Sequence, residues 1–112
     1  MDRALTLKKE GNTAFGSGEL DQAIAKWKHA IVVATATTAG RDDGLDKLLV
    51  ACHANVSAAY LKTGKPLLSL QAADRALAVS RASHKSWFRR ARALQSLGSL
   101  FDMMHYFAIS YD

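Results

Sequence analysis

Five polar side chains, in three separate stretches of the chain, have the residue types and the spacing of an anion-binding site. Lys8 and Asn12 are four residues apart, which places them on one face of a helix. Lys85 and Arg89 repeat this spacing, and Asn55 adds a second amide. An ammonium group is a point-charge donor, a guanidinium can hold a carboxylate through two parallel bonds, and an amide both donates and accepts. The set therefore suits an anion that carries more than one carboxylate.

Each of these residues, taken alone, is ordinary on a solvated helix surface. A lysine there is usually free in solvent, and an asparagine can satisfy a local backbone group instead. The interpretation as a site depends on a fold that brings the three stretches to one surface.

The composition and the apolar pattern favour an all-α fold. The chain of 112 residues has a single proline, and apolar residues recur at three- and four-residue spacing through most of it. Three short turns interrupt this pattern, at 16–20, 63–67 and 97–101. We therefore predict six helices, at about 3–16, 20–37, 45–63, 66–80, 83–97 and 100–111.

The turn glycines repeat at a fixed distance. Gly64 and Gly98 are 34 residues apart, and Gly18 and Gly64 are 46 apart, which is 34 plus 12. A helix–turn–helix unit of 34 residues is the period of tetratricopeptide repeats. Small residues, Ala23 and Ser69, follow the first two turn glycines by five residues and would let paired helices approach closely. We predict one domain, 1–112, with repeats at about 4–37, 50–83 and 84–112 and an inserted loop at about 38–49.

The chain resembles the carboxylate-clamp tetratricopeptide domains of chaperone co-factors. That family has Lys-x-x-x-Asn in the first repeat, Asn in the second and Lys-x-x-x-Arg in the third, and the five residues above match every position. The resemblance implies an α-solenoid, a right-handed superhelix with a concave peptide groove. It also implies a partner: the C-terminal Glu-Glu-Val-Asp tail of heat-shock protein 90, heat-shock protein 70 or both.

The resemblance further implies a role for each matched residue. Lys8, Asn12, Asn55, Lys85 and Arg89 would hold the two carboxylates of the terminal aspartate. Phe15, Ala58 and Phe88 would form part of the groove wall. The seventh helix that usually caps the family's domain is absent, and the longer spacing between the first two repeats is more like that of immunophilin-type co-chaperones.

Two other functions stay open from the sequence. A general tetratricopeptide scaffold could bind an internal peptide or a helix of a partner. A basic nucleic-acid-binding domain would explain the net charge of +5 and the cluster Arg89, Arg90 and Arg92, although no aromatic–basic interleaving typical of an RNA motif is visible.

The sequence offers little for catalysis, metal binding or a membrane. Its four histidines form no metal-binding pair, and no phosphate-binding loop occurs. Cys52 and His53 are neighbours, and neighbours in a helix point about 100° apart. The longest apolar runs, Ala30–Ala34 and Leu48–Cys52, are far too short to cross a bilayer. We therefore expect a soluble cytoplasmic binding protein, not an enzyme, with no cofactor and no metal.

The last predicted helix is strongly apolar. Repeat arrays usually end in a helix with a polar outer face, which is missing here. Either the chain is cut from a longer protein or it associates with another copy through this surface. The apolar residues are Leu100, Phe101, Met103, Met104, Tyr106, Phe107 and Ile109.

Overall fold

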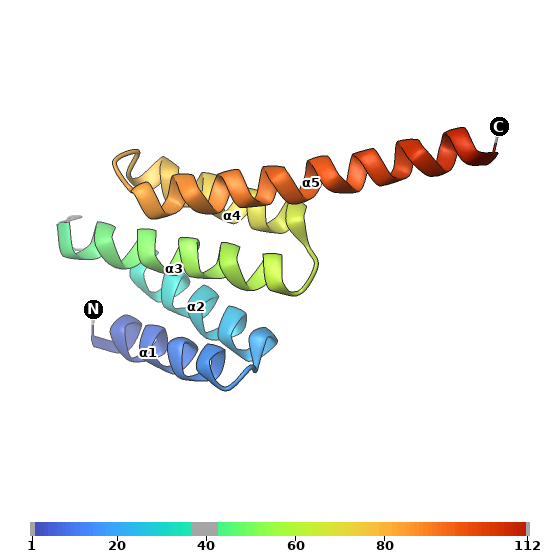
Figure 1. Ribbon diagram of the computed structural model, residues 1–112. Coiled ribbons are helices and arrows are strands. Elements are labelled where there is room, and N and C mark those ends of the chain that lie inside the picture. Colours follow the sequence, from blue (N-terminus) through green and yellow to red (C-terminus); the bar gives the residue numbers. More distant parts are fainter. Residues whose placement is uncertain (1, 37–42, 112) are drawn as a thin grey trace.

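Five α-helices account for nearly all of the described chain. The computed structural model describes the backbone of residues 2–36 and 43–111 and the side chains of residues 3–36 and 43–105. Within this part there is no strand, so the predicted all-α class is confirmed. No described helix is both long enough and apolar enough to span a membrane. The helices are α1 (Asp2–Gly16), α2 (Leu20–Thr35), α3 (Asp43–Lys62), α4 (Pro66–Val79) and α5 (His84–Tyr111) (Figure 1).

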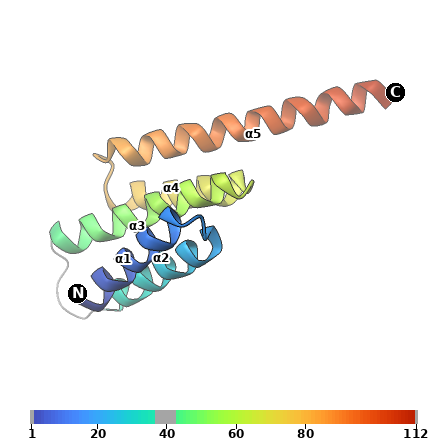
Figure 2. The ribbon, with the colours of Figure 1, turned by 60° about the horizontal axis from the view of Figure 1, so that its bottom comes forward.

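The helices stack as two layers. α1 packs against α2, and α3 packs against α4, as two helical hairpins; α3 also packs on α2, and α5 packs on α3 and α4. As a result α1, α3 and α5 lie in one layer, with α2 and α4 behind it (Figure 1). α5 extends well beyond the other four helices (Figure 2).

Two of the three predicted turns between paired helices, at 16–20 and 63–67, are present. Gly18 and Gly64 have φ values of 79° and 76°, in the left-handed region that glycine adopts without a steric cost. The next residue in each turn donates its backbone N–H to a carbonyl five residues back, Glu19 to Ala14 and Lys65 to Tyr60, at 2.9 Å. This geometry satisfies a carbonyl that the helix end leaves free. Pro66 then begins α4, where its missing N–H costs nothing.

Close helix pairing depends on small residues. Ala23 and Ser69, predicted as small contact positions, are fully buried. The Ser57 hydroxyl of α3 donates to the Ser69 carbonyl at 2.8 Å, and the Ser69 hydroxyl donates to the Ser57 carbonyl at 2.7 Å. In the first hairpin, a Cβ on Gly11 would lie 2.5 Å from Nε1 of Trp27. The α1 backbone therefore rests directly on the indole, a contact that repeat spacing alone did not reveal.

The predicted break at 97–101 is wrong, and the fold has five helices instead of six. α5 runs without interruption through Gly98. A glycine inside a helix costs only about 1 kcal/mol relative to alanine, which does not by itself end a helix. At the second turn Pro66 follows Gly64 by two residues, whereas no proline follows Gly98. The described chain therefore has two complete helix pairs and a fifth, long helix.

The predicted inserted loop at 38–49 is also too long. α3 begins at Asp43, so residues 43–49 belong to its first two turns. Leu45, Leu48 and Leu49 are buried, and Asp43 and Asp46 lie in the first turn, where acidic side chains interact favourably with the helix dipole. The rest of the predicted loop, 38–42, lies outside the described residues.

The second half of α5 carries the apolar surface that the sequence predicted. Leu100, Phe101, Met103 and Met104 are all exposed, Phe101 to 65%. The side chains of the other three predicted residues, Tyr106, Phe107 and Ile109, lie outside the described part.

Candidate functional site

The front layer of helices carries all five predicted residues, and three of them, Asn12, Asn55 and Arg89, line one hollow, which we call the groove. α1 carries Lys8 and Asn12, α3 carries Asn55, and α5 carries Lys85 and Arg89. These three helices lie side by side (Figure 1). A hollow of about 170 Å³ is lined by six side chains from four helices: Asn12, Phe15, Trp27, Asn55, Ala58 and Arg89.

Three cations lie at this groove. Burial lowers the pKa of Lys85 from its ordinary value, and the positive charges of Arg89 and Lys8 lower it further. Lys85 Nζ donates to Asn55 Oδ1 at 3.2 Å. No acidic side chain in the described ranges pairs with Lys8, Lys85 or Arg89. The groove therefore holds concentrated positive charge that an anion would neutralise.

Arg89 carries a buried donor without a partner. Its Nε is buried and has no hydrogen-bond acceptor among the described residues. Its guanidinium carbon lies 5.7 Å from the centre of the Phe88 ring, within the range of a cation–π contact. A buried unsatisfied donor costs about 1–3 kcal/mol, so an acceptor that reached Arg89 would recover this energy.

The two amides present hydrogen-bond donors to the groove. Trp27 Nε1 donates to Asn12 Oδ1 at 3.1 Å, and also lies 3.2 Å from the Lys8 carbonyl oxygen. Asn55 Oδ1 already accepts from Lys85. With each amide oxygen engaged, the NH2 groups of Asn12 and Asn55 are left to donate. Ammonium, guanidinium and amide groups thus all offer N–H, and such a surface selects an acceptor-only group such as a carboxylate.

The three residues predicted for the groove wall differ in their surroundings. Phe15 and Ala58 line the 170 Å³ hollow, and the Phe15 ring lies 5.6 Å from the Trp27 ring. Lys62 Nζ lies 4.8 Å from the centre of the Phe15 ring. Phe88 does not line this hollow; it is exposed next to Arg89.

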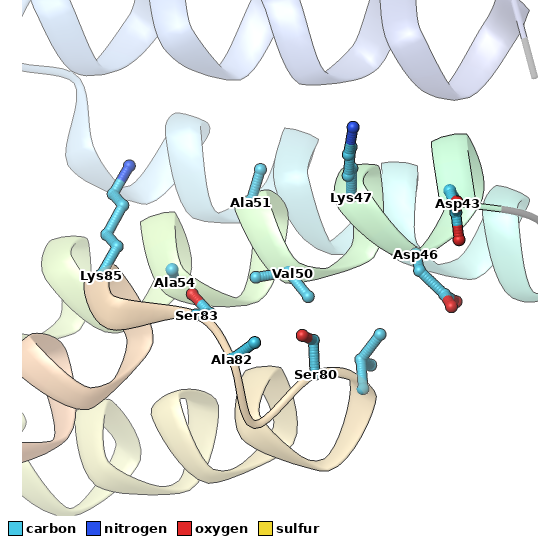
Figure 3. A pocket seen from close by; sticks show the side chains of 11 residues that line it. Asp43, Asp46, Lys47, Val50, Ala51, Ala54, Ser80, Ala82, Ser83 and Lys85 are labelled. Atoms are coloured by element: carbon cyan, nitrogen blue, oxygen red, sulfur yellow. The ribbon is translucent and has the colours of Figure 1, made fainter.

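A larger hollow, of about 450 Å³, adjoins the groove at Lys85. It lies between the first half of α3 and the segment that joins α4 to α5 (Figure 3). Its floor is apolar, with Val50, Ala51 and Ala54, and Asp43 and Asp46 lie at the end away from Lys85 (Figure 3). Because carboxylates repel one another, an anion bound at the groove would be kept from that far end.

Cys52 is expected to be unreactive in the folded protein. It is fully buried, and burial raises the pKa of its thiol to about 11, although the charge of Lys8 opposes this. Only the thiolate is nucleophilic, so little of it exists at pH 8. Iodoacetamide labelling, followed by mass spectrometry, should modify Cys52 slowly in buffer and rapidly in urea. Equal rates in the two conditions would contradict this prediction.

Within the described residues, no cluster of three or more His, Cys, Asp or Glu could hold a metal.

Known proteins that are similar in sequence match most of this chain. No family model matches the chain. Protein unc-45 homolog B of Danio rerio is 35% identical over 97 residues, which cover 87% of this chain and 10% of that protein. Sperm-associated antigen 1 of Mus musculus is 33% identical over 96 residues, with 86% and 10% covered. The chain thus spans about a tenth of the length of these relatives.

Two solved structures superpose on most of the chain. The first tetratricopeptide domain of Spaghetti (RPAP3), bound to the HSP90 peptide SRMEEVD, matches with a TM-score of 0.73 and 24% identity, over 88% of this chain and 69% of that one. The C-terminal tetratricopeptide-containing domain of a Plasmodium falciparum FK506-binding protein matches with a TM-score of 0.71 and 22% identity, over 86% and 73%.

Proposed function

Because the chain has the tetratricopeptide-repeat fold, we propose that it is a protein-interaction module that binds the C-terminal acidic peptide of heat-shock protein 90, heat-shock protein 70 or both. One observation supports the proposal: Asn12, Asn55 and Arg89 line one hollow, and Lys8 and Lys85 add positive charge beside Arg89 without an acidic partner among the described residues. The similar RPAP3 domain was solved with an HSP90 peptide that ends in this way.

The proposed mechanism is a clamp on two carboxylates at the peptide's end. Arg89, with its unpartnered Nε, binds one carboxylate, and Lys8 and Lys85 supply point charges. Asn12 and Asn55 donate amide N–H groups to the same oxygens. A few charge-assisted bonds, reduced by the cost of ordering the peptide, correspond to roughly −8 kcal/mol, which is a micromolar Kd. On this proposal the first part of α5 takes the place of the first helix of a third repeat.

A general scaffold that binds an internal peptide is the second candidate. The 450 Å³ hollow favours this second candidate, because it lies beyond Lys85. A peptide whose last residue was held at the clamp would not enter that hollow, whereas a peptide bound through an internal segment could fill it. A nucleic-acid surface is less favoured by the contacts. Arg90 is bonded to Asp74 at 2.9 Å, and Arg89 is half-buried, so the basic cluster on α5 is not one free face.

Amidation of the peptide separates these candidates. Isothermal titration with a Met-Glu-Glu-Val-Asp peptide is expected to give a micromolar Kd for the free acid. The C-terminal amide, which lacks one carboxylate, should bind about 30-fold or more weakly, since it loses charge-assisted bonds worth more than about 2 kcal/mol. Equal affinity of the two forms would refute the clamp and favour recognition of an internal segment.

A further inference from the structure

A second hollow, which we call the outer hollow, lies where α2, α3 and α4 meet. α2 and α4 each pack on α3, but within the described residues they do not pack on one another, so α3 forms the floor between them. His53 lies on that floor, and Asn55 of the groove follows two residues later. Two residues turn a helix by about 200°, so the outer hollow and the groove lie on opposite sides of α3.

The outer hollow has uncovered apolar walls. Val32 of α2 is 61% exposed and Leu68 of α4 is 41% exposed, although both line the hollow above the buried floor residue Val56. The hollow measures about 270 Å³. Pockets that enclose small molecules usually measure about 300–1,000 Å³, so this space suits one or two side chains from a protein segment.

The charges that line the outer hollow have one sign. Lys28 of α2 and Arg75 of α4 lie on opposite walls, and the Lys28 Nζ lies 5.2 Å from the centre of the Tyr60 ring. No acidic residue lines the hollow, and neither cation forms an ion pair within the described ranges. Burial, and then the charge of Arg75, lowers the pKa of His53, which favours the neutral imidazole. An imidazole and two cations that form no ion pair within the described ranges can all bind a carboxylate.

We propose that the outer hollow is a second binding site, for a protein segment that inserts an apolar side chain between Val32 and Leu68 and places an acidic side chain between Lys28 and Arg75. The apolar walls would bury the apolar side chain of the bound segment, and the two cations would favour a segment that carries an acidic side chain. Peptide-binding surfaces commonly combine these two contributions. The bound segment need not end at this site. Among the described residues, the outer hollow shares no lining residue with the 170 Å³ hollow of the groove.

The test uses the peptide Ac-Glu-Leu-Glu-Phe-Glu-NH2. Its blocked ends leave no C-terminal carboxylate for the proposed clamp to bind. Titration of the ¹⁵N-labelled protein should shift the backbone signals of Val32, Leu68 and Gln71 and leave those of Asn12 and Arg89 unchanged. The matched peptide with glutamine in place of glutamate should bind more weakly. Shifts centred on Asn12 and Arg89, or no shifts at all, would overturn the proposal.

Charge reversal provides the matched variants. Lys28→Glu with Arg75→Glu is expected to weaken binding of the blocked peptide about tenfold or more, because two attractive contacts become repulsive. Lys65→Glu with Arg92→Glu changes the net charge equally at exposed sites outside the hollow and should have little effect. If the first pair unfolds the protein, Lys28→Gln with Arg75→Gln should weaken binding in the same direction. Equal binding by all variants would overturn the proposal.

Two further measurements complete the test. The Lys28→Glu, Arg75→Glu variant should still bind the free-acid Met-Glu-Glu-Val-Asp peptide, so failure of one site can be told from failure of the other. Raising the protein concentration without peptide should not shift Val32 or Leu68. If it did, a second copy of the chain would occupy the outer hollow, and the proposal of a different protein partner would be wrong.

Discussion

Replacing Arg89 by alanine is expected to raise the Kd of the free-acid Met-Glu-Glu-Val-Asp peptide by about 30- to 150-fold. The change removes a guanidinium whose Nε is buried without a partner in the described chain, and it leaves a peptide carboxylate without its bidentate donor. Truncating one member of a buried charge pair typically costs about 2–3 kcal/mol or more, which corresponds to this change in Kd. Isothermal titration measures the effect.

Arg92→Ala is the matched control. Arg92 is three residues further along α5, is exposed and does not line the groove hollow, so its removal changes the net charge equally without touching the proposed clamp. The Kd of the free-acid peptide for the Arg92→Ala variant should differ from that of the unchanged protein by less than about threefold, the usual size of an exposed charge effect. A similar loss in both variants would mean that net charge, and not the clamp, determines binding.

Arg89→Ala should leave the domain folded. The positive charge of Arg89 lowers the pKa of Lys85, so in the free protein the two cations repel each other. Removing Arg89 removes that repulsion, and the pKa of Lys85 should rise, which NMR titration of its side chain can follow. The groove is therefore a place where the free protein carries an electrostatic cost that binding an anion would relieve, as is common at functional sites.

Most helix boundaries could be predicted because the local sequence determines them. Gly18 and Gly64 supply the left-handed residue that ends a helix, and Pro66 begins the next one. Neither Gly18 nor Gly98 is followed by a proline, so whether a turn forms at such a glycine depends on whether the following apolar segment finds a surface to pack on. Spacing along the sequence carries no information about that surface. The predicted helix at 45–63 begins only two residues after the observed start of α3, whose first turns are stabilised by burial of Leu45, Leu48 and Leu49.

Only some features of the candidate site, like only some of the helix boundaries, could be predicted from the sequence. The helices that carry the five polar residues follow from helical spacing and from the order of the repeats, and three of these residues, Asn12, Asn55 and Arg89, line one hollow. The orientation of the Asn12 amide does not follow from spacing, because it depends on Trp27, a residue of the neighbouring helix. Nor does spacing reveal that Gly11 must be small so that α1 can rest on the same indole. These contacts are set by the distance between two helices.

Trp27→Ala is expected to lower the free energy of unfolding by about 3–5 kcal/mol, the usual cost of removing a large buried aromatic side chain. Trp27 is only 2% exposed and fills the space between Gly11 and Phe15, so the truncation leaves a cavity at the α1–α2 contact. Urea denaturation followed by circular dichroism measures the loss. Trp87→Ala is the control: Trp87 is 39% exposed, and its main contact is a hydrogen bond from Nε1 to the Arg81 carbonyl at 2.8 Å, so it should cost about 1 kcal/mol.

Trp27→Phe tests whether the same side chain also prepares the site. Phenylalanine keeps an aromatic ring in the core but lacks the Nε1 donor that holds Asn12 Oδ1 at 3.1 Å. Without that bond the Asn12 amide can rotate, and part of its population would turn an acceptor toward the peptide carboxylate. The Kd of the free-acid peptide should then rise by about three- to tenfold, the value of one neutral hydrogen bond, while the protein stays folded. An unchanged Kd would show that Trp27 acts only in packing. A rise limited to this variant and absent in Trp87→Phe would mean that the core contact between α1 and α2 also sets the direction of a donor in the groove.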